Sequence, residues 1–190
     1  MFERTTVKFL FFIFVLLFYS FCSHAQKSFA VVELFTSEGC SSCPPAEKVL
    51  QQMKAEHEKN KENVFFLEYH VDYWNRLGWK DAYSSFQFTK RQENYTSALS
   101  EPTIYTPMLL VNGANPVTGS DAEAVEKNIQ VGLSQKHDIK LSASVDSVVN
   151  DTIFVSYKTS KTDKNYFLRL AVTEDDLVSK IGRGENSGKT

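Results

Sequence analysis

Two cysteines, Cys40 and Cys43, lie between an apolar segment and the start of an expected helix, with two residues between them. Residues 30–35 have the β-branched and aromatic content of a buried strand. Pro44 and Pro45 suit a first helical turn, where missing N–H groups cost nothing. A thiol at a helix N-terminus lies beside unpaired amides and the positive end of the helix dipole, which favour the thiolate. The pattern therefore predicts a strand, turn and helix that support dithiol–disulfide chemistry.

Residues 1–25 have the layout of a cleaved signal peptide. Arg4 and Lys8 supply positive charge, and an almost unbroken apolar run follows over residues 9–21. That run is shorter than the ~20 residues of a membrane-spanning helix, and the small residues after it fit a signal-peptidase site. We therefore expect a mature chain that begins at Gln26, is exported and keeps no stable membrane anchor. An uncleaved signal anchor is the alternative.

Cleavage also removes Cys22, so that Cys40 and Cys43 are the remaining cysteines. In an exported protein disulfides persist, and a single adjacent pair favours a functional role over a structural one. A disulfide this local closes almost no loop and stabilises a fold little. The net charge of −2, with opposite charges intermixed, gives no sign of a nucleic-acid surface. The expected partners are thiols or disulfides of proteins.

The next elements follow in α/β order. A second apolar strand is expected over residues 64–71, and the helix before it makes a right-handed strand–helix–strand unit with a parallel sheet. The segment 72–85 is rich in aromatic residues, which either pack in the core or form a platform that contacts substrate. Residues 85–99 then read as an amphipathic helix with Phe86, Phe88 and Tyr95 turned inward.

A proline before an apolar strand marks the second informative stretch. Pro107 precedes the strand 108–111, and Asn112-Gly113 is typical of a hairpin turn. Ser120, with Glu123 three residues on, predicts a helix that ends near Gly132.

The sequence after this predicted helix no longer follows the α/β pattern. Residues 139–148, 152–159 and 166–173 alternate apolar and polar side chains, which predicts an antiparallel β meander and a boundary near residue 135. The glycine-rich stretch 182–190 looks like a phosphate-binding loop, but its first glycine is misplaced and no helix follows. We therefore expect two units, residues 26–135 and 136–190.

With Cys-Ser-Ser-Cys after one strand and Thr106-Pro107 before another, the chain resembles the thioredoxin superfamily. More closely, the stretches that contain these motifs, 32–45 and 105–107, together with 70–74 and 77–81, resemble a secreted bacterial family, domain of unknown function 1223. The resemblance implies an α/β, thioredoxin-like fold with an antiparallel β appendage, and a periplasmic or secreted location. Similar family members continue into another strand, so it also implies a truncated appendage. The substrate of that family is not established.

The resemblance also implies site roles. Pro107 is expected to be cis and to face the dithiol across the site, with the backbone of Thr106 offered to an extended substrate segment. Independently of the resemblance, Trp74 is the expected substrate contact if the aromatic segment 72–85 forms a platform beside the cysteines. In the implied reaction Cys40 attacks a substrate disulfide and Cys43 resolves the mixed disulfide, without a cofactor. The dipeptide between the cysteines is Ser-Ser rather than Gly-Pro, so the reducing strength of thioredoxin does not carry over.

A buried acid next to the dithiol is a further expectation. Glu33, on the preceding strand, is a candidate proton acceptor for Cys43, and Glu38 is an equally available one.

Two other readings of the cysteines stay open. One is a binding module with a permanently oxidised, structural disulfide. The other is a copper site made by Cys40, Cys43 and His70. A zinc site lacks the second pair of ligands that it needs, and no metal is expected.

Overall fold

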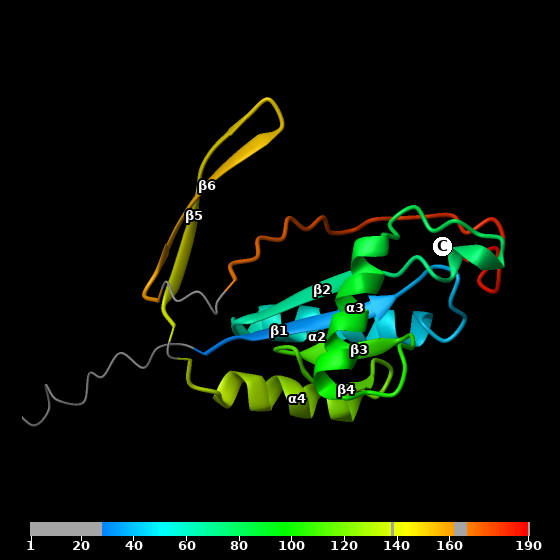
Figure 1. Cartoon of the computed structure of the whole chain (residues 1–190), viewed down its shortest axis with the longest axis horizontal. Coiled ribbons are helices and arrows are strands. Elements are labelled where there is room, and N and C mark those ends of the chain that lie inside the picture. The colour runs from blue at the N-terminus through cyan, green and yellow to red at the C-terminus, as the bar shows by residue number, and fades with distance from the viewer. Residues whose placement is uncertain (1–27, 138, 162–166, 190) are drawn as a thin grey trace, which may run out of the picture.

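A computed structural model describes residues 28–137, 139–161 and 167–189 (Figure 1). The expected signal peptide, residues 1–25, lies outside these ranges. Among the described residues, no helix has both the length and the apolar character needed to cross a membrane. The chain forms a mixed α/β structure with a four-stranded sheet and a separate two-stranded sheet.

The four-stranded sheet has the order β2-β1-β3-β4. β1 (Ala30–Thr36) runs parallel to β2 (Val64–His70) and antiparallel to β3 (Met108–Val111), which pairs antiparallel with β4 (Ala114–Thr118). The helix α2 (Pro44–Asn60) connects β1 to β2. The predicted strand–helix–strand unit is therefore confirmed, including the parallel orientation of its two strands.

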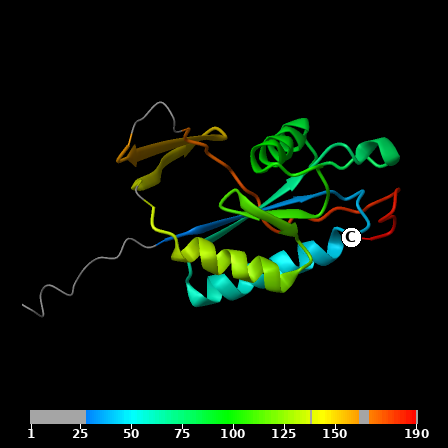
Figure 2. The same cartoon turned by 60° about the horizontal axis from the view of Figure 1, so that its bottom comes forward.

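Helices cover both faces of this sheet (Figure 2). α2 and α4 (Ala122–Ser134) lie on one face, and α3 (Phe86–Leu99) lies on the other. Successive side chains of a strand point to opposite faces, so β1 supplies two cores. Val32 and Leu34 pack with α2 and α4, whereas Phe35 packs against the side that carries α3. The β1 side chains that contribute to the two cores, Val32, Leu34 and Phe35, are fully buried.

Asn112 and Gly113 form the turn between β3 and β4, as predicted. Both residues have positive φ, 52° and 69°, which a two-residue hairpin turn requires.

Two helix details differ from the sequence-based expectation. The side chain of Asp121, not Ser120, accepts the Ala124 N–H at 3.1 Å and caps α4. Gly132 does not end α4 but lies inside it, where an added Cβ would meet Ala30 at 3.2 Å. The glycine therefore serves close packing of the helix on the sheet rather than helix termination.

The predicted helix over residues 85–99 is confirmed, with the Ser85 hydroxyl accepting the Gln87 N–H at its start. Phe86 was expected to face inward, and this is wrong. Its side chain is 57% exposed because the first residue of α3 points away from the sheet, while Tyr95 packs against Phe35.

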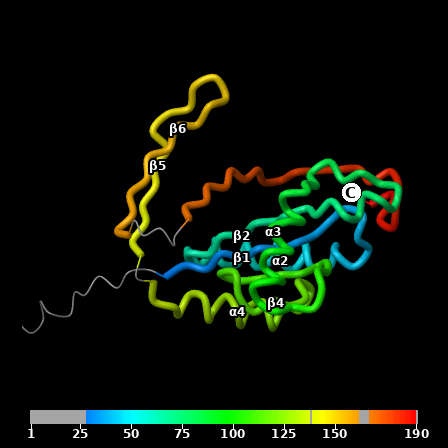
Figure 3. The backbone as a smooth tube through the Cα atoms, in the orientation of Figure 1, coloured from blue at the N-terminus to red at the C-terminus, as the bar shows by residue number. Residues whose placement is uncertain are grey.

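β5 (Leu141–Val149) and β6 (Thr152–Thr159) form an antiparallel hairpin that stands away from the larger sheet (Figure 1). The third strand predicted over 166–173 is not formed by residues 167–173, and residue 166 lies outside the described ranges. This segment does not pair with β6 but runs back along the main unit toward the end that carries the cysteines (Figure 3). Asp175 contacts Lys54 of α2 at 2.6 Å. A segment of alternating apolar and polar residues forms a strand only where it can pair with the edge of a sheet.

Candidate functional site: a disulfide loop enclosed by distant segments

The site is built on the turn between β1 and α2. Cys40 and Cys43 form a disulfide with a Cα–Cα distance of 5.4 Å, and Cys43 immediately precedes α2. The Cys40 N–H donates to the Ser37 carbonyl at 3.0 Å, and the Cys43 N–H donates to the Cys40 carbonyl at 3.2 Å. Both cysteines have an exposed fraction of 0%, although Ser41 and Ser42 between them are exposed. The sulfur atoms therefore lie beneath their neighbours rather than at the surface.

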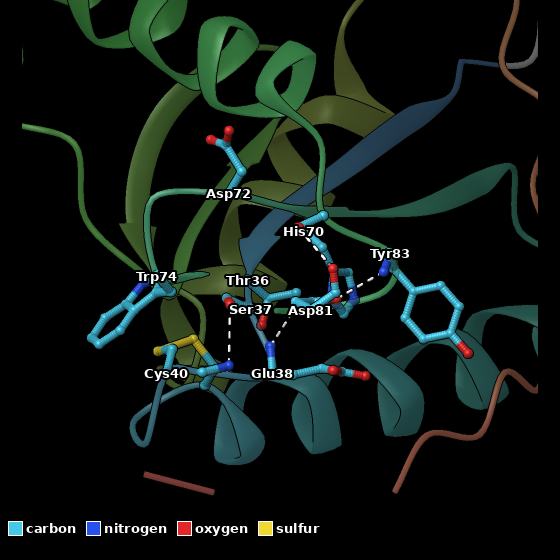
Figure 4. Close-up of polar contacts among 12 residues, drawn as sticks. Thr36, Ser37, Glu38, Cys40, His70, Asp72, Trp74, Asp81 and Tyr83 are labelled. Carbon is cyan, nitrogen blue, oxygen red and sulfur yellow. Dashed lines mark hydrogen bonds and ion pairs between the residues drawn. A yellow bond between two sulfur atoms is a disulfide. The ribbon is translucent and has the colours of Figure 1, made fainter. Parts of the chain in front are cut away.

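Thr106 and Trp74 lie directly against the disulfide. The Thr106 hydroxyl donates to Cys40 Sγ at 3.2 Å and accepts the indole N–H of Trp74 at 2.9 Å. The peptide bond between Thr106 and Pro107 is cis, and Pro107 is buried. The structure thus brings these three expected substrate-contacting residues together beside Cys40 (Figure 4, which labels Trp74 and Cys40). Their roles toward a substrate stay predictions.

Glu38 lies close to the cysteines, but its side chain points away from them (Figure 4). One carboxylate oxygen accepts the indole N–H of Trp79 at 2.6 Å. The other, Oε1, is buried and has no hydrogen-bond partner among the described residues. An unpaired buried carboxylate oxygen is costly, so this atom is a place where a hydrogen-bond donor from another molecule is favoured.

Glu33 is buried on the opposite face of the sheet from α2. Its carboxylate accepts hydrogen bonds from Arg91 Nε at 2.8 Å, from Arg91 Nη2, and from the Tyr95 hydroxyl at 2.5 Å. The odd-numbered residues of β1 face α3, whereas Cys43 leads into α2 on the other face. The described residues show no hydrogen bond from Glu33 to either cysteine. Its role as a proton acceptor for Cys43 therefore stays a prediction without a supporting contact.

Asp81 is a central residue of the site that sequence reasoning did not single out. Its buried carboxylate accepts the backbone N–H of Glu38 at 2.9 Å and that of Tyr83 at 2.9 Å, and lies 2.7 Å from His70 Nδ1 (Figure 4). It thereby joins the cysteine turn to the aromatic segment and to the end of β2. An aspartate within that aromatic segment, with a histidine at the end of the neighbouring strand, was the available signal.

Charge pairing sets the protonation of these two groups. Burial lowers the pKa of His70, but the hydrogen bond and charge of Asp81 outweigh it, and the net pKa is raised. Burial raises the pKa of Asp81, but the His70 contact and the two backbone N–H donors outweigh it, and the net pKa is lowered. The Nδ1 atom of His70 is thus used by Asp81. Over the described ranges, no cluster of three or more histidine, cysteine or acidic side chains is arranged to hold a metal ion.

The segment 181–189, which we call the C-terminal loop, also contacts the cysteine turn. It closes on itself through hydrogen bonds from the Ile181 N–H to the Lys189 carbonyl and from the Gly188 N–H to the Ile181 carbonyl. The side-chain amide of Asn186 donates to the carbonyls of Glu38 and Cys40 at 2.9 and 2.7 Å. Figures 2 and 3 show this red end of the chain next to the cyan start of α2.

Two more contacts complete the enclosure. The Glu185 carboxylate accepts the Ser41 N–H at 3.2 Å. Gly182 and Gly184 lie against the Trp79 side chain so closely that added Cβ atoms would meet its ring at 3.1 Å and its Cβ at 3.3 Å, respectively. Sequence reasoning placed this loop in a β appendage and missed its part in the site. The closely spaced glycines, needed for the approach to Trp79, were the signal.

Comparison with known proteins gives a family but no activity. A crystal structure of the protein AGR_C_4864 from Agrobacterium tumefaciens is 29% identical, covers 71% of this chain and 74% of its own, and has a TM-score of 0.54. HBP35 of Porphyromonas gingivalis is 14% identical, with 65% of this chain and 38% of that chain covered and a TM-score of 0.41. No curated protein matches the sequence. Residues 31–190 match the family described as "Protein of unknown function (DUF1223)", and the chain therefore belongs to that family.

Proposed function

We propose that the protein is an exported, periplasmic or secreted thiol–disulfide oxidoreductase with a thioredoxin-like fold. The observation that carries the proposal is the Cys40–Cys43 disulfide at the start of α2, with the Thr106 hydroxyl 3.2 Å from Cys40 Sγ. The parallel pairing of β1 with β2 and the cis bond before Pro107 support the fold part of the proposal. Its substrates are disulfides or thiols of proteins or small molecules.

The reaction balances as two exchanges. The Cys40 thiolate attacks one sulfur of a substrate disulfide, so a mixed disulfide forms and the other substrate sulfur leaves as a thiolate that takes a proton. Cys43 loses its proton and attacks Cys40 Sγ, which releases the second substrate thiol. The substrate gains two electrons and two protons, and the Cys40–Cys43 disulfide is restored. Neither of the two acids considered for the Cys43 proton hydrogen-bonds a cysteine within the described structure: Glu38 points away from the disulfide, and Glu33 pairs with Arg91 and Tyr95.

A binding module with a permanently oxidised disulfide is the second candidate. The observation that favours it is the complete burial of both cysteines. A substrate disulfide must reach Cys40 Sγ, so exchange requires Trp74 or Thr106 to move from the contacts that they make in the oxidised protein.

The reduction potential separates the two candidates. The mature protein is equilibrated in glutathione buffers, and its free thiols are trapped and counted. A potential of ~−120 to −270 mV supports an oxidoreductase, whereas one below about −300 mV marks a structural disulfide. As a kinetic companion, Cys43→Ser should retain a mixed disulfide with glutathione on Cys40. The matched Cys40→Ser variant should retain much less, since Cys43 is the resolving thiol.

A further inference from the structure

We infer that the C-terminal loop belongs to the dithiol site and that Glu185 is a positioning residue that disfavours the Cys40 thiolate. This inference rests on the proposed thiol–disulfide function and adds a residue that sets the reactivity of that site. It starts from contacts that connect residues about 146 positions apart in the sequence.

The first step is that the loop is fixed to the cysteine turn. Asn186 is 1% exposed, and burying an amide is unfavourable unless it is hydrogen-bonded. Its two donors are satisfied by the carbonyls of Glu38 and Cys40. Trp79 packs under Gly182 and Gly184, and its indole N–H bonds Glu38 of the same turn. The loop is therefore held to the cysteine turn by buried hydrogen bonds at Glu38 and Cys40.

The second step concerns the backbone N–H of Ser41, which donates a hydrogen bond to Glu185. The Ser41 N–H belongs to the residue that follows Cys40, three positions before α2 begins at Pro44, and a backbone donor beside a cysteine favours its thiolate. In this structure it donates to the Glu185 carboxylate at 3.2 Å. Hydrogen bonds from Ser41 hold the pKa of Glu185 below its usual range, so the carboxylate is ionised at neutral pH. A negative charge thus lies against the residue that follows Cys40, where it disfavours the Cys40 thiolate.

Other charged groups around the turn act in known directions. Glu38, two residues before Cys40, disfavours the thiolate as Glu185 does, and Asp81 beyond it has the same sign. Lys189 donates to Asn186 Oδ1 at 2.8 Å and favours the thiolate. Because the other charges stay in place when Glu185 is neutralised, the sign of the expected change is fixed. The apparent pKa of the Cys40 thiol should fall.

The equilibrium consequence follows from the exchange with glutathione. One glutathione thiolate attacks the Cys40–Cys43 disulfide and forms a mixed disulfide, and a second attacks that mixed disulfide. The products are glutathione disulfide and the reduced cysteine pair, so the protein gains two electrons and two protons. Stabilising the Cys40 thiolate favours the reduced protein. Neutralising Glu185 should therefore make the reduction potential less negative.

The test uses the full mature chain, reduced with a phosphine, and measures the rate of Cys40 alkylation against pH. Glu185→Gln keeps an oxygen acceptor for Ser41 but removes the charge. We expect a lower apparent thiol pKa and alkylation about two- to threefold faster at neutral pH, the size of a single charge effect in a nearly aqueous environment. The matched control is Glu56→Gln, an exposed α2 residue ~20 Å along the helix from Cys43 and beyond the ~10 Å screening length. It should match wild type.

Asn186→Ala tests the anchoring step. Releasing the loop removes the Glu185 carboxylate from Ser41, so the thiol pKa should again fall. Adding Glu185→Gln to Asn186→Ala should then have little further effect, because the two changes act through one contact. Additive effects of the two changes would overturn the assignment of Glu185 to this contact.

Failure of the inference and failure of the proposed function give different results. If Glu185→Gln has the wild-type pH profile and potential, the inference is wrong, even where the wild-type potential lies in the exchange range. If the wild-type potential lies below about −300 mV, the proposed function is wrong. The pH profile of the chemically reduced protein still reports on Glu185 in that case. A purely structural role would change the thermal midpoint and leave the thiol profile unmoved.

Discussion

The buried pair of Glu33 and Arg91 allows a stability prediction of defined size. Glu33 is 2% exposed, and Arg91 Nε donates to it at 2.8 Å. The Arg91 guanidinium also lies over the rings of Tyr69 and Tyr95, at 5.1 and 5.2 Å from their centres. Arg91→Met keeps a long apolar side chain but leaves the carboxylate with the Tyr95 hydroxyl as its remaining partner. Removing one partner of a buried pair costs about 3–5 kcal/mol of the free energy of unfolding.

Urea unfolding of the oxidised protein measures this loss. With a slope of about 2 kcal/mol per molar urea, the midpoint should fall by about 1.5–2.5 M. The matched control is Lys90→Met on the preceding residue of α3. Lys90 pairs with Glu93 at 2.6 Å, but both side chains are substantially exposed, 52% and 39%. Such a pair contributes about 0–0.5 kcal/mol, so the midpoint should move by no more than about 0.25 M.

A triple variant separates charge burial from packing. Glu33→Leu, Arg91→Met and Tyr95→Phe together remove the charge and its partners, and an apolar replacement of a whole buried pair is often nearly neutral. We expect most of the loss caused by Arg91→Met alone to be recovered. A loss below about 1 kcal/mol for Arg91→Met, or a triple variant less stable than the single one, would refute the reasoning. A changed pH profile of Cys43 in the triple variant would instead support Glu33 as its proton acceptor.

Three further predictions concern the site and the leader. Because the pKa of His70 is raised in the folded protein, its pairing with Asp81 contributes fully to stability below pH 6.5, and this contribution is lost as the pH rises through the raised pKa. Because the pKa of Asp81 is lowered, the contribution of its ionised form is lost at the other end, as the pH falls below 3.8. The urea midpoint should therefore decrease above neutral pH in wild type, and His70→Asn should flatten that decrease; an unchanged slope contradicts the pairing. Thr106→Val removes the acceptor of the Trp74 indole N–H and should cost about 1–2 kcal/mol in thermal unfolding, whereas Thr106→Ser should cost less. Equal losses for the two variants would show that the hydroxyl is not the relevant group. N-terminal sequencing of exported protein should begin at Gln26, and a retained leader would favour the signal anchor.

The sequence predicts the centre of this fold well, because the centre is built from local patterns. Each of β1, β2 and the proline-led start of α2 is formed by one continuous stretch of sequence with its own pattern. The Asn112-Gly113 pair is typical of one kind of two-residue hairpin turn. Failures arise where tertiary contacts decide. Gly132 is a packing residue that resembles a helix terminator, and Asp121 outcompetes its neighbour Ser120 as a helix cap.

The candidate site was only partly predictable for the same reason. Cys40, Thr106 and Pro107 come from motifs whose spacing carries information, and the structure brings them together. Asp81 and the C-terminal loop act mainly on backbone N–H and carbonyl groups, which every residue possesses. No residue pattern in the cysteine turn identifies such partners. The alternation of apolar and polar residues over 166–173 likewise predicts a strand, but it does not specify the strand with which this segment would pair.

The contact between Asn186 and the cysteine turn has a consequence for biosynthesis. Asn186 follows its two partners, Glu38 and Cys40, by 148 and 146 residues, so the ribosome synthesises the cysteines long before the loop that encloses them. β1, α2 and β2 can assemble early, leaving the cysteine pair open to oxidants while the chain is still emerging. The pair becomes enclosed only when the C-terminal loop arrives. Access to these cysteines therefore differs between the growing chain and the finished protein.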